Sequence, residues 1–220
     1  MDALKDPGMY LDLIFEIFDA AGKLQDRHEE EGHSYVANFA RFMFGYMGGN
    51  LQTEDIDGNP VTWADTSGLT YTGTMSYTWV SSTEFTAAAG SGIATYGIVL
   101  GTDDGAIYPK GINNFKLGAQ IGHGVGGGAT PNIQYGTHSI LNPTHDGATY
   151  SYAGLTRGFS VSNGLGDPVT IKEMGLVVQA TIGSSSNQKK FLIVRDILAS
   201  MITVPDGSSL LATYRFKALI

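Results

Sequence analysis

The chain has 220 residues, enough for one domain of about 200 residues or for a compact domain with an appendage. Its net charge of −8 and 13 scattered Lys and Arg residues argue against a sequence-independent grip on nucleic acid. The absence of cysteine excludes disulfides, thiolate metal sites and cysteine nucleophiles. We see no signal peptide and no apolar stretch near the ~20 residues that span a bilayer, so we expect no membrane partner and synthesis in a cytoplasm.

Glycine is abundant and charge is sparse. The chain contains 30 glycines without a collagen period, which predicts many turns and close backbone approaches. Charged residues make up 15% of the chain, against about 25% in typical domains. Two interpretations remain open: other subunits cover part of the surface, or the surface is simply rich in Ser, Thr and Asn.

The N-terminal segment predicts a β-hairpin. One side of residues 9–19 is strongly apolar, with the period of a strand. That side consists of Leu11, Leu13, Phe15 and Ile17. A turn around Gly22 leads into a polar strand at 24–30. A helix over 9–19 is the alternative, but Gly22 and the β-rich composition favour the hairpin.

A helix is predicted to follow, with Ser34 as its N-cap and Gly48-Gly49 at its end. Its apolar stripe has helical spacing and comprises Val36, Phe39, Ala40, Met43, Tyr46 and Met47. Phe42 and Phe44 lie off this stripe, so the helix is apolar nearly all round. We therefore expect Phe42 and Phe44 to be buried, under the sheet of the same chain or at an interface with another subunit.

The rest of the chain predicts an antiparallel β-sandwich or jelly-roll-like domain. Strands are expected at 93–100, 115–121, 132–140, 149–161, 169–179, 190–198, 201–204 and 209–218. The fold class is therefore mainly β, with a short N-terminal hairpin and one α-helix. Residues 1–49 form the hairpin-plus-helix module and 50–220 the sandwich, or both form one continuous domain. We expect 210–220 to be an apolar edge strand able to pair with a neighbouring subunit.

No motif predicts catalysis or a cofactor. The glycine tract 122–128 lacks the Gly-Lys-Ser/Thr ending of a phosphate-binding loop, and no Gly-x-Ser-x-Gly elbow occurs. His123, His138 and His145 lack the spacing of a zinc site, so ordinary hydrogen bonding is the simpler interpretation. The acidic loops at 55–58 and 103–105 lack the EF-hand pattern; they are turn formers or, as the alternative, calcium ligands. We predict no catalytic, cofactor or metal residues.

Charged residues inside apolar strands are the more informative feature. Arg195 and Asp196 are adjacent in an apolar strand, so their side chains point to opposite faces. We predict an ion pair of Arg195 with Glu173, across strands or across subunits, that fixes strand register more than it adds stability. Arg157 is a further candidate for such a structural role.

Four aromatic residues suggest a second kind of site. Trp63, Tyr71, Tyr77 and Trp79 lie in a Gly/Thr/Ser-rich stretch and could stack on sugar rings of a host glycan. The alternative is that they form sheet core and cross-strand pairs.

The order of several short motifs resembles a known group of proteins. The motifs are Thr156-Arg-Gly-Phe-Ser, Lys172-Glu-x-Gly-Leu, Ile193-Val-Arg-Asp-Ile-Leu, Ile202-Thr-Val-Pro-x-Gly and a strand ending Tyr214-x-Phe. In this order they resemble structural proteins of tailed bacteriophages, described as virion, tail or fibre-like. The resemblance covers most of the chain except about residues 50–90.

The resemblance implies a non-enzymatic component located in the virion. Its partners would be copies of itself and other capsid or tail proteins. Because no coiled coil or triple helix marks a fibre, a head decoration protein is favoured. A tail, neck or fibre protein, or a glycan-binding receptor-recognition module, is the alternative.

Overall fold

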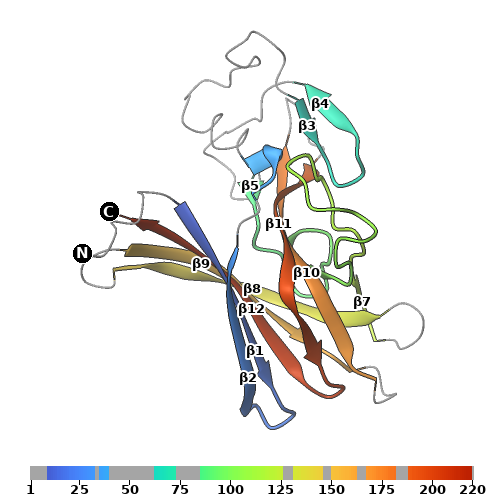
Figure 1. The fold of residues 1–220 in the computed structure, drawn as a ribbon, viewed down its shortest axis with the longest axis vertical. Coiled ribbons are helices and arrows are strands. Elements are labelled where there is room, and N and C mark those ends of the chain that lie inside the picture. The colour runs from blue at the N-terminus through green and yellow to red at the C-terminus, as the bar shows by residue number, and fades with distance from the viewer. Residues whose placement is uncertain are drawn as a thin grey trace.

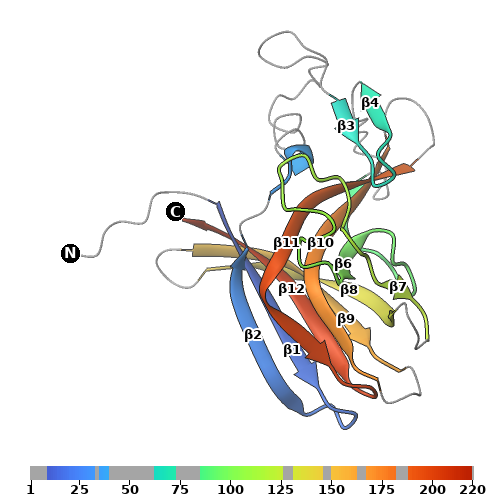
Figure 2. The same cartoon turned by 45° about the vertical axis from the view of Figure 1, so that its right-hand side comes forward.

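A computed structural model describes residues 9–32, 35–39, 62–72, 85–125, 131–145, 150–162, 167–181 and 188–219. The fold is mainly β and its long strands pair antiparallel, which confirms the predicted fold class. Figures 1 and 2 show a large sheet with β10 and β11 packed across it, and the β3–β4 hairpin at the far end of the molecule.

The large sheet has six strands in the order β2-β1-β12-β9-β8-β7. These are β1 Met9–Phe18, β2 Leu24–Gly32, β7 Gly122–His123, β8 Asn132–His145, β9 Tyr150–Ser160 and β12 Ser209–Leu219. The predicted N-terminal hairpin is confirmed, and Gly22 in its turn has a φ of 77° that suits glycine. The helical alternative for residues 9–18 is excluded.

The C-terminal strand is not an edge strand, and that prediction was wrong. β12 pairs along its whole length with β1 on one side and β9 on the other. The apolar composition of residues 210–214 thus reflects a central position in the sheet. The strand brings the two ends of the chain into one sheet, together with the N-terminal hairpin.

The smaller sheet is built around β10, which pairs with β11, β5 and β6. The bounds are β5 Phe85–Thr86, β6 Gly97–Gly101, β10 Val169–Thr181 and β11 Gln188–Val204. β11 is one continuous strand where two were predicted, because register shifts in the pairing with β10 absorb the irregularity. A separate hairpin joins β3 Thr62–Ala64 to β4 Thr70–Thr72.

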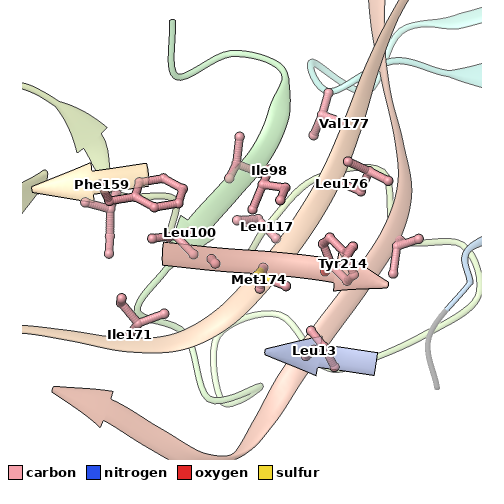
Figure 3. Close-up of a cluster of buried hydrophobic side chains, with 14 of the residues drawn as sticks. Leu13, Ile98, Leu100, Leu117, Phe159, Ile171, Met174, Leu176, Val177 and Tyr214 are labelled. Carbon is pink, nitrogen blue, oxygen red and sulfur yellow. The ribbon is translucent and has the colours of Figure 1, made fainter. Parts of the chain in front are cut away.

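The two sheets pack face to face around one apolar core. Figure 3 shows Leu13 and Tyr214 of the large sheet lying against Met174 of the smaller one. All three side chains are completely buried. The alternation of β1 explains this geometry, because Leu11, Leu13, Phe15 and Ile17 share the face that meets the smaller sheet.

The opposite face of β10 and β11 is covered as well. The connection from β6 to β7, residues 102–121, lies beside these strands in both views (Figures 1 and 2). Residues Phe191–Asp196 of β11 are consequently buried on both faces. The predicted strand at 115–121 is replaced by this loop, in which only Gln120 makes an isolated bridge, to Gly101.

The predicted helix is described only at its start. Residues 37–39 are helical, and Tyr35 before them bridges to Val194 on the free edge of β11. Phe42 and Phe44 lie outside the described residues, so their burial stays a prediction.

Candidate functional site

Arg195 lies fully buried on the face of β11 that is turned away from the large sheet. Its Nε and Nη2 atoms are each 2.9 Å from Glu173 Oε2 on β10. Nη2 is also 3.2 Å from Asp103 Oδ2, and Nη1 donates to Asn114 Oδ1 at 3.0 Å. The Tyr108 ring lies 5.1 Å from the guanidinium carbon. Arg195, Glu173, Asp103 and Asn114 are termed the Arg195 cluster below.

The predicted Arg195–Glu173 pair thus occurs across two strands of the same chain. Asp103 and Asn114 were not predicted as its partners. Both come from a loop much earlier in the chain, at separations of 92 and 81 residues. Sequence patterns report local periodicity, and no local pattern signals such a distant contact. The available signal was an arginine inside an apolar strand, which requires buried acceptors.

The cluster contains two carboxylates for one guanidinium, and the loop backbone stabilises the excess negative charge. Two amides donate to Glu173 and three to Asp103. The donors are Gly118 and Ala119 for the former, and Gly105, Ile107 and Tyr108 for the latter. Gly118 permits this close approach, because a Cβ atom there would collide with the Asp103 carboxylate. Every carboxylate of the cluster therefore fixes loop backbone to the sheet.

The cluster joins an exposed loop to the smaller sheet. Residues 104–116, termed the presented loop, follow the cluster residue Asp103 and contain the cluster residue Asn114. Ile107 is 74% exposed and Ile112 66% exposed. Pro109 and Lys110 between them are exposed as well. The buried charges on the sheet thus anchor a surface loop that exposes two isoleucines beside polar residues.

Arg157 on β9 forms a second buried polar centre, without a carboxylate among the described residues. All five N–H groups of its guanidinium donate to backbone carbonyls. The acceptors are the carbonyls of Gly90, Ile93, Tyr96, Ile98 and Gly136. The Tyr135 ring lies 4.7 Å from the guanidinium carbon. Burial lowers the pKa of Arg157 to about 10, so it remains charged at neutral pH and ties the 90–98 segment to β8 and β9.

His138 on β8 fixes the same segment from its other side. Its Nε2 accepts from the Ile98 amide at 2.8 Å, and its Nδ1 lies 2.9 Å from the Ala89 carbonyl. This pattern requires a neutral ring with the proton on Nδ1. Burial lowers the pKa of His138 to about 4; the Arg157 charge acts in the same direction and the bond to Ala89 opposes it. Gly97, with a φ of 86°, leaves room for the ring, which a Cβ atom would strike.

The fold is therefore expected to weaken in mild acid through His138. Its pKa is about 6.5 when unfolded and about 4 when folded, so the unfolded chain binds more protons between these values. The stabilisation is complete above pH 6.5 and disappears as pH falls through 4, with a total of at most about 3 kcal/mol. Denaturant unfolding at pH 4.5 and pH 7 should show a smaller difference for His138→Gln than for the wild type. An equal difference would contradict this role.

His123, Asp103 and Asp104, considered above as metal ligands or turn formers, have partners within the chain. His123 Nδ1 accepts from the Tyr135 amide at 3.1 Å, while the His145 side chain lies outside the described part. Asp103 bonds amides two to five residues ahead, as a turn former does, and Asp104 pairs with Lys172. Within the described segments, no three His, Asp or Glu residues gather as metal ligands. Asp55 and Asp57 fall outside those segments.

Two of the four predicted glycan-stacking residues are described, and both pack inward. Trp63 is 4% exposed and makes an edge contact with Phe191 of the core. Tyr71 also meets Phe191 edge-on, its hydroxyl donates to Asp65, and Lys189 Nζ lies 5.2 Å from the ring centre. Trp63 is therefore part of the core, as the alternative to glycan stacking expected, and it offers no ring face to a ligand. Tyr77 and Trp79 lie outside the described residues.

Over the parts of the chain that the structure describes, no helix is long and apolar enough to cross a membrane. Comparison with protein-family models, with curated proteins and with solved structures found no match for this chain.

Proposed function

We propose that this chain is a non-enzymatic structural component of a tailed-phage virion, with a head decoration role favoured over a tail, neck or fibre role. The order of sequence motifs described above supports the virion assignment. The acidic balance and the predicted all-round apolar helix suit a multi-copy protein that is covered in part by its neighbours.

The presented loop is the observation that carries the proposal. Burying an ion pair costs desolvation energy and contributes more to a defined geometry than to stability. Here the geometry so fixed is that of a surface loop with exposed Ile107 and Ile112. A loop already held in its bound shape loses little entropy on binding. Such a loop suits docking onto another protein surface, as assembly of a particle requires.

The chemistry of the buried groups also supports a structural role. Arg195 and Arg157 donate hydrogen bonds to groups inside the chain, and both ring nitrogens of His138 are hydrogen-bonded to backbone atoms. These groups hold loops to strands. Their arrangement therefore explains a stable display scaffold without assigning them a reaction.

Assembly through the presented loop can be tested with charge-matched variants. Ile107→Asp places a charge at the exposed tip, and Met201→Asp places the same charge on an exposed strand position 65% accessible. Light scattering over a concentration series should show oligomers for the wild type and Met201→Asp. We expect the oligomers of Ile107→Asp to dissociate at a protein concentration at least about 10-fold higher than those of the wild type. A 10-fold change corresponds to the loss of a contact of about 1.4 kcal/mol. Identical masses for the two variants would contradict an assembly role for the loop.

A further inference from the structure

A pocket of about 170 Å³ opens beside the presented loop. Its walls come from three separate parts of the chain: the segment around Asn38, the β3–β4 hairpin and the C-terminal end of the loop. The residues used below are Asn38, Thr62, Thr70, Asn113 and Phe115. It is distinct from the buried Arg195 cluster, although Asn114 belongs to both.

The volume corresponds to one six-membered ring. Engineered protein cavities of about 150 Å³ admit benzene, and a water molecule occupies about 30 Å³ of liquid. The pocket therefore exceeds the space of one or two waters and is too small for a dinucleotide or a peptide segment. It is also open to solvent, so a ring at the end of a longer molecule can enter.

The described lining is uncharged and mixes polar with apolar groups. Thr62, Thr70 and Asn113 present hydroxyl and amide groups, and none of the described residues that line the pocket is Asp, Glu, Lys, Arg or His. Thr70 and Asn113 are exposed, so their hydroxyl and amide groups can reach a ligand in the pocket. Phe115 adds an aromatic ring to the same wall. A hydroxylated, uncharged ring with an apolar face matches this lining better than a hydrocarbon or an ion does.

The walls are held in place before any ligand binds. Asn38 Nδ2 donates to the Ala64 and Leu192 carbonyls, which joins the helical segment to the hairpin and to β11. The Ala37 amide donates to the Ile112 carbonyl at 2.7 Å, which joins the same segment to the presented loop. Asn114 is fixed by Arg195. Because the walls of a preformed pocket are already ordered, ligand binding loses less free energy to ordering them.

We propose that this pocket binds a single neutral pyranose ring, either as a free sugar or as the terminal residue of a glycan. The proposal goes beyond the assembly role and does not rest on it. It also places sugar recognition on Thr62, Thr70, Asn113 and Phe115. The stacking platform predicted above consisted instead of Trp63, Tyr71, Tyr77 and Trp79.

Titration of the full chain with neutral methyl glycosides of glucose, galactose and N-acetylglucosamine tests the proposal. The readout is the amide chemical shifts of residues 112–115 in nitrogen-15 NMR spectra. We expect saturable shifts for at least one glycoside, with a dissociation constant on the order of 1–10 mM for so small a ligand. Glucuronate serves as the charged probe. An oligosaccharide ending in the preferred sugar distinguishes the two sources of the ring. If the ligand is a glycan, the oligosaccharide should bind more tightly than the methyl glycoside. If the ligand is a free sugar, the two should bind equally well.

Three variants locate the site. Asn113→Ala removes an exposed polar group, and Thr70→Phe places a ring at the pocket on a strand that tolerates aromatics. Each should weaken binding at least 5-fold. Lys110→Ala, on the same loop but outside the pocket, should leave binding unchanged. The proposal is overturned if no neutral glycoside binds up to about 100 mM, which lies well beyond the expected range. It is also overturned if Asn113→Ala and Thr70→Phe bind normally, or if glucuronate binds more tightly than every neutral glycoside.

Discussion

Replacing Arg195 with methionine is expected to lower the free energy of unfolding by about 3–5 kcal/mol, the cost of breaking a buried ion pair. The variant leaves two fully buried carboxylates, Glu173 and Asp103, facing each other without their guanidinium. Methionine fills similar space, so the loss measures charge and hydrogen bonding more than cavity formation. Equilibrium denaturation gives the value, and faster amide exchange in residues 103–119 should accompany it.

Two further variants separate this effect from a general loss of surface charge. Lys172→Met removes the partly exposed partner of Asp104 and should change stability little. Adding Glu173→Gln to Arg195→Met should recover part of the loss, because it removes one uncompensated charge. If Arg195→Met proves too unstable to purify, Arg195→Lys keeps the charge but loses the fork of donors, and should show a smaller loss. An Arg195→Met protein as stable as the wild type would contradict the cluster's role.

Replacing Arg157 with methionine is expected to destabilise the protein by about 4 kcal/mol or more. Its side chain satisfies five carbonyls, and a buried acceptor without a donor costs about 1–3 kcal/mol. Because the structure relaxes in part and water enters, the loss of unfolding free energy should be smaller than the summed cost of five unsatisfied carbonyls. The stability of Arg157→Lys should lie between those of the wild type and Arg157→Met, because an ammonium has three donors for the five acceptors.

Arg27→Met is the matched control for Arg157. Arg27 has a side chain 48% exposed and pairs with Glu29 on the surface, so its loss should be under about 1 kcal/mol. Hydrogen exchange adds a local readout, since the amide of Ile98 should lose protection in Arg157→Met. Equal unfolding midpoints for Arg157→Met and Arg27→Met would show that the buried arginine does not hold this segment.

The strands were predictable because their signal is local. Alternation in β1 and runs of β-branched residues in β10 and β11 identified these elements within a few residues. The central position of β12 was not predictable, because an apolar strand reads alike at an edge and in the middle of a sheet. Its pairing with β1 joins residues some 200 positions apart, as Met9 with Ala218 shows.

In the Arg195 cluster, only the residues on β10 and β11 were predictable from the sequence. Arg195 and Glu173 share adjacent strands, so their pairing followed from strand order. The opposite directions of Arg195 and Asp196 were also expected, yet both are buried, because a loop covers one face and the large sheet the other. The loop over 115–121 carries strand-like residues, but its amides at Gly118 and Ala119 bond the Glu173 carboxylate. A side chain thus takes the place of a strand partner.

The presence of the chain in virions tests the virion proposal most directly. Under the virion proposal, quantitative mass spectrometry of purified phage particles, with immunogold labelling, measures the copy number and position of the chain. We expect many copies per particle, labelled over the head, and a strong reduction of incorporated protein for Ile107→Asp but not for Met201→Asp. Particles that lack the protein, while infected cells contain it in soluble form, would contradict a structural role in the virion.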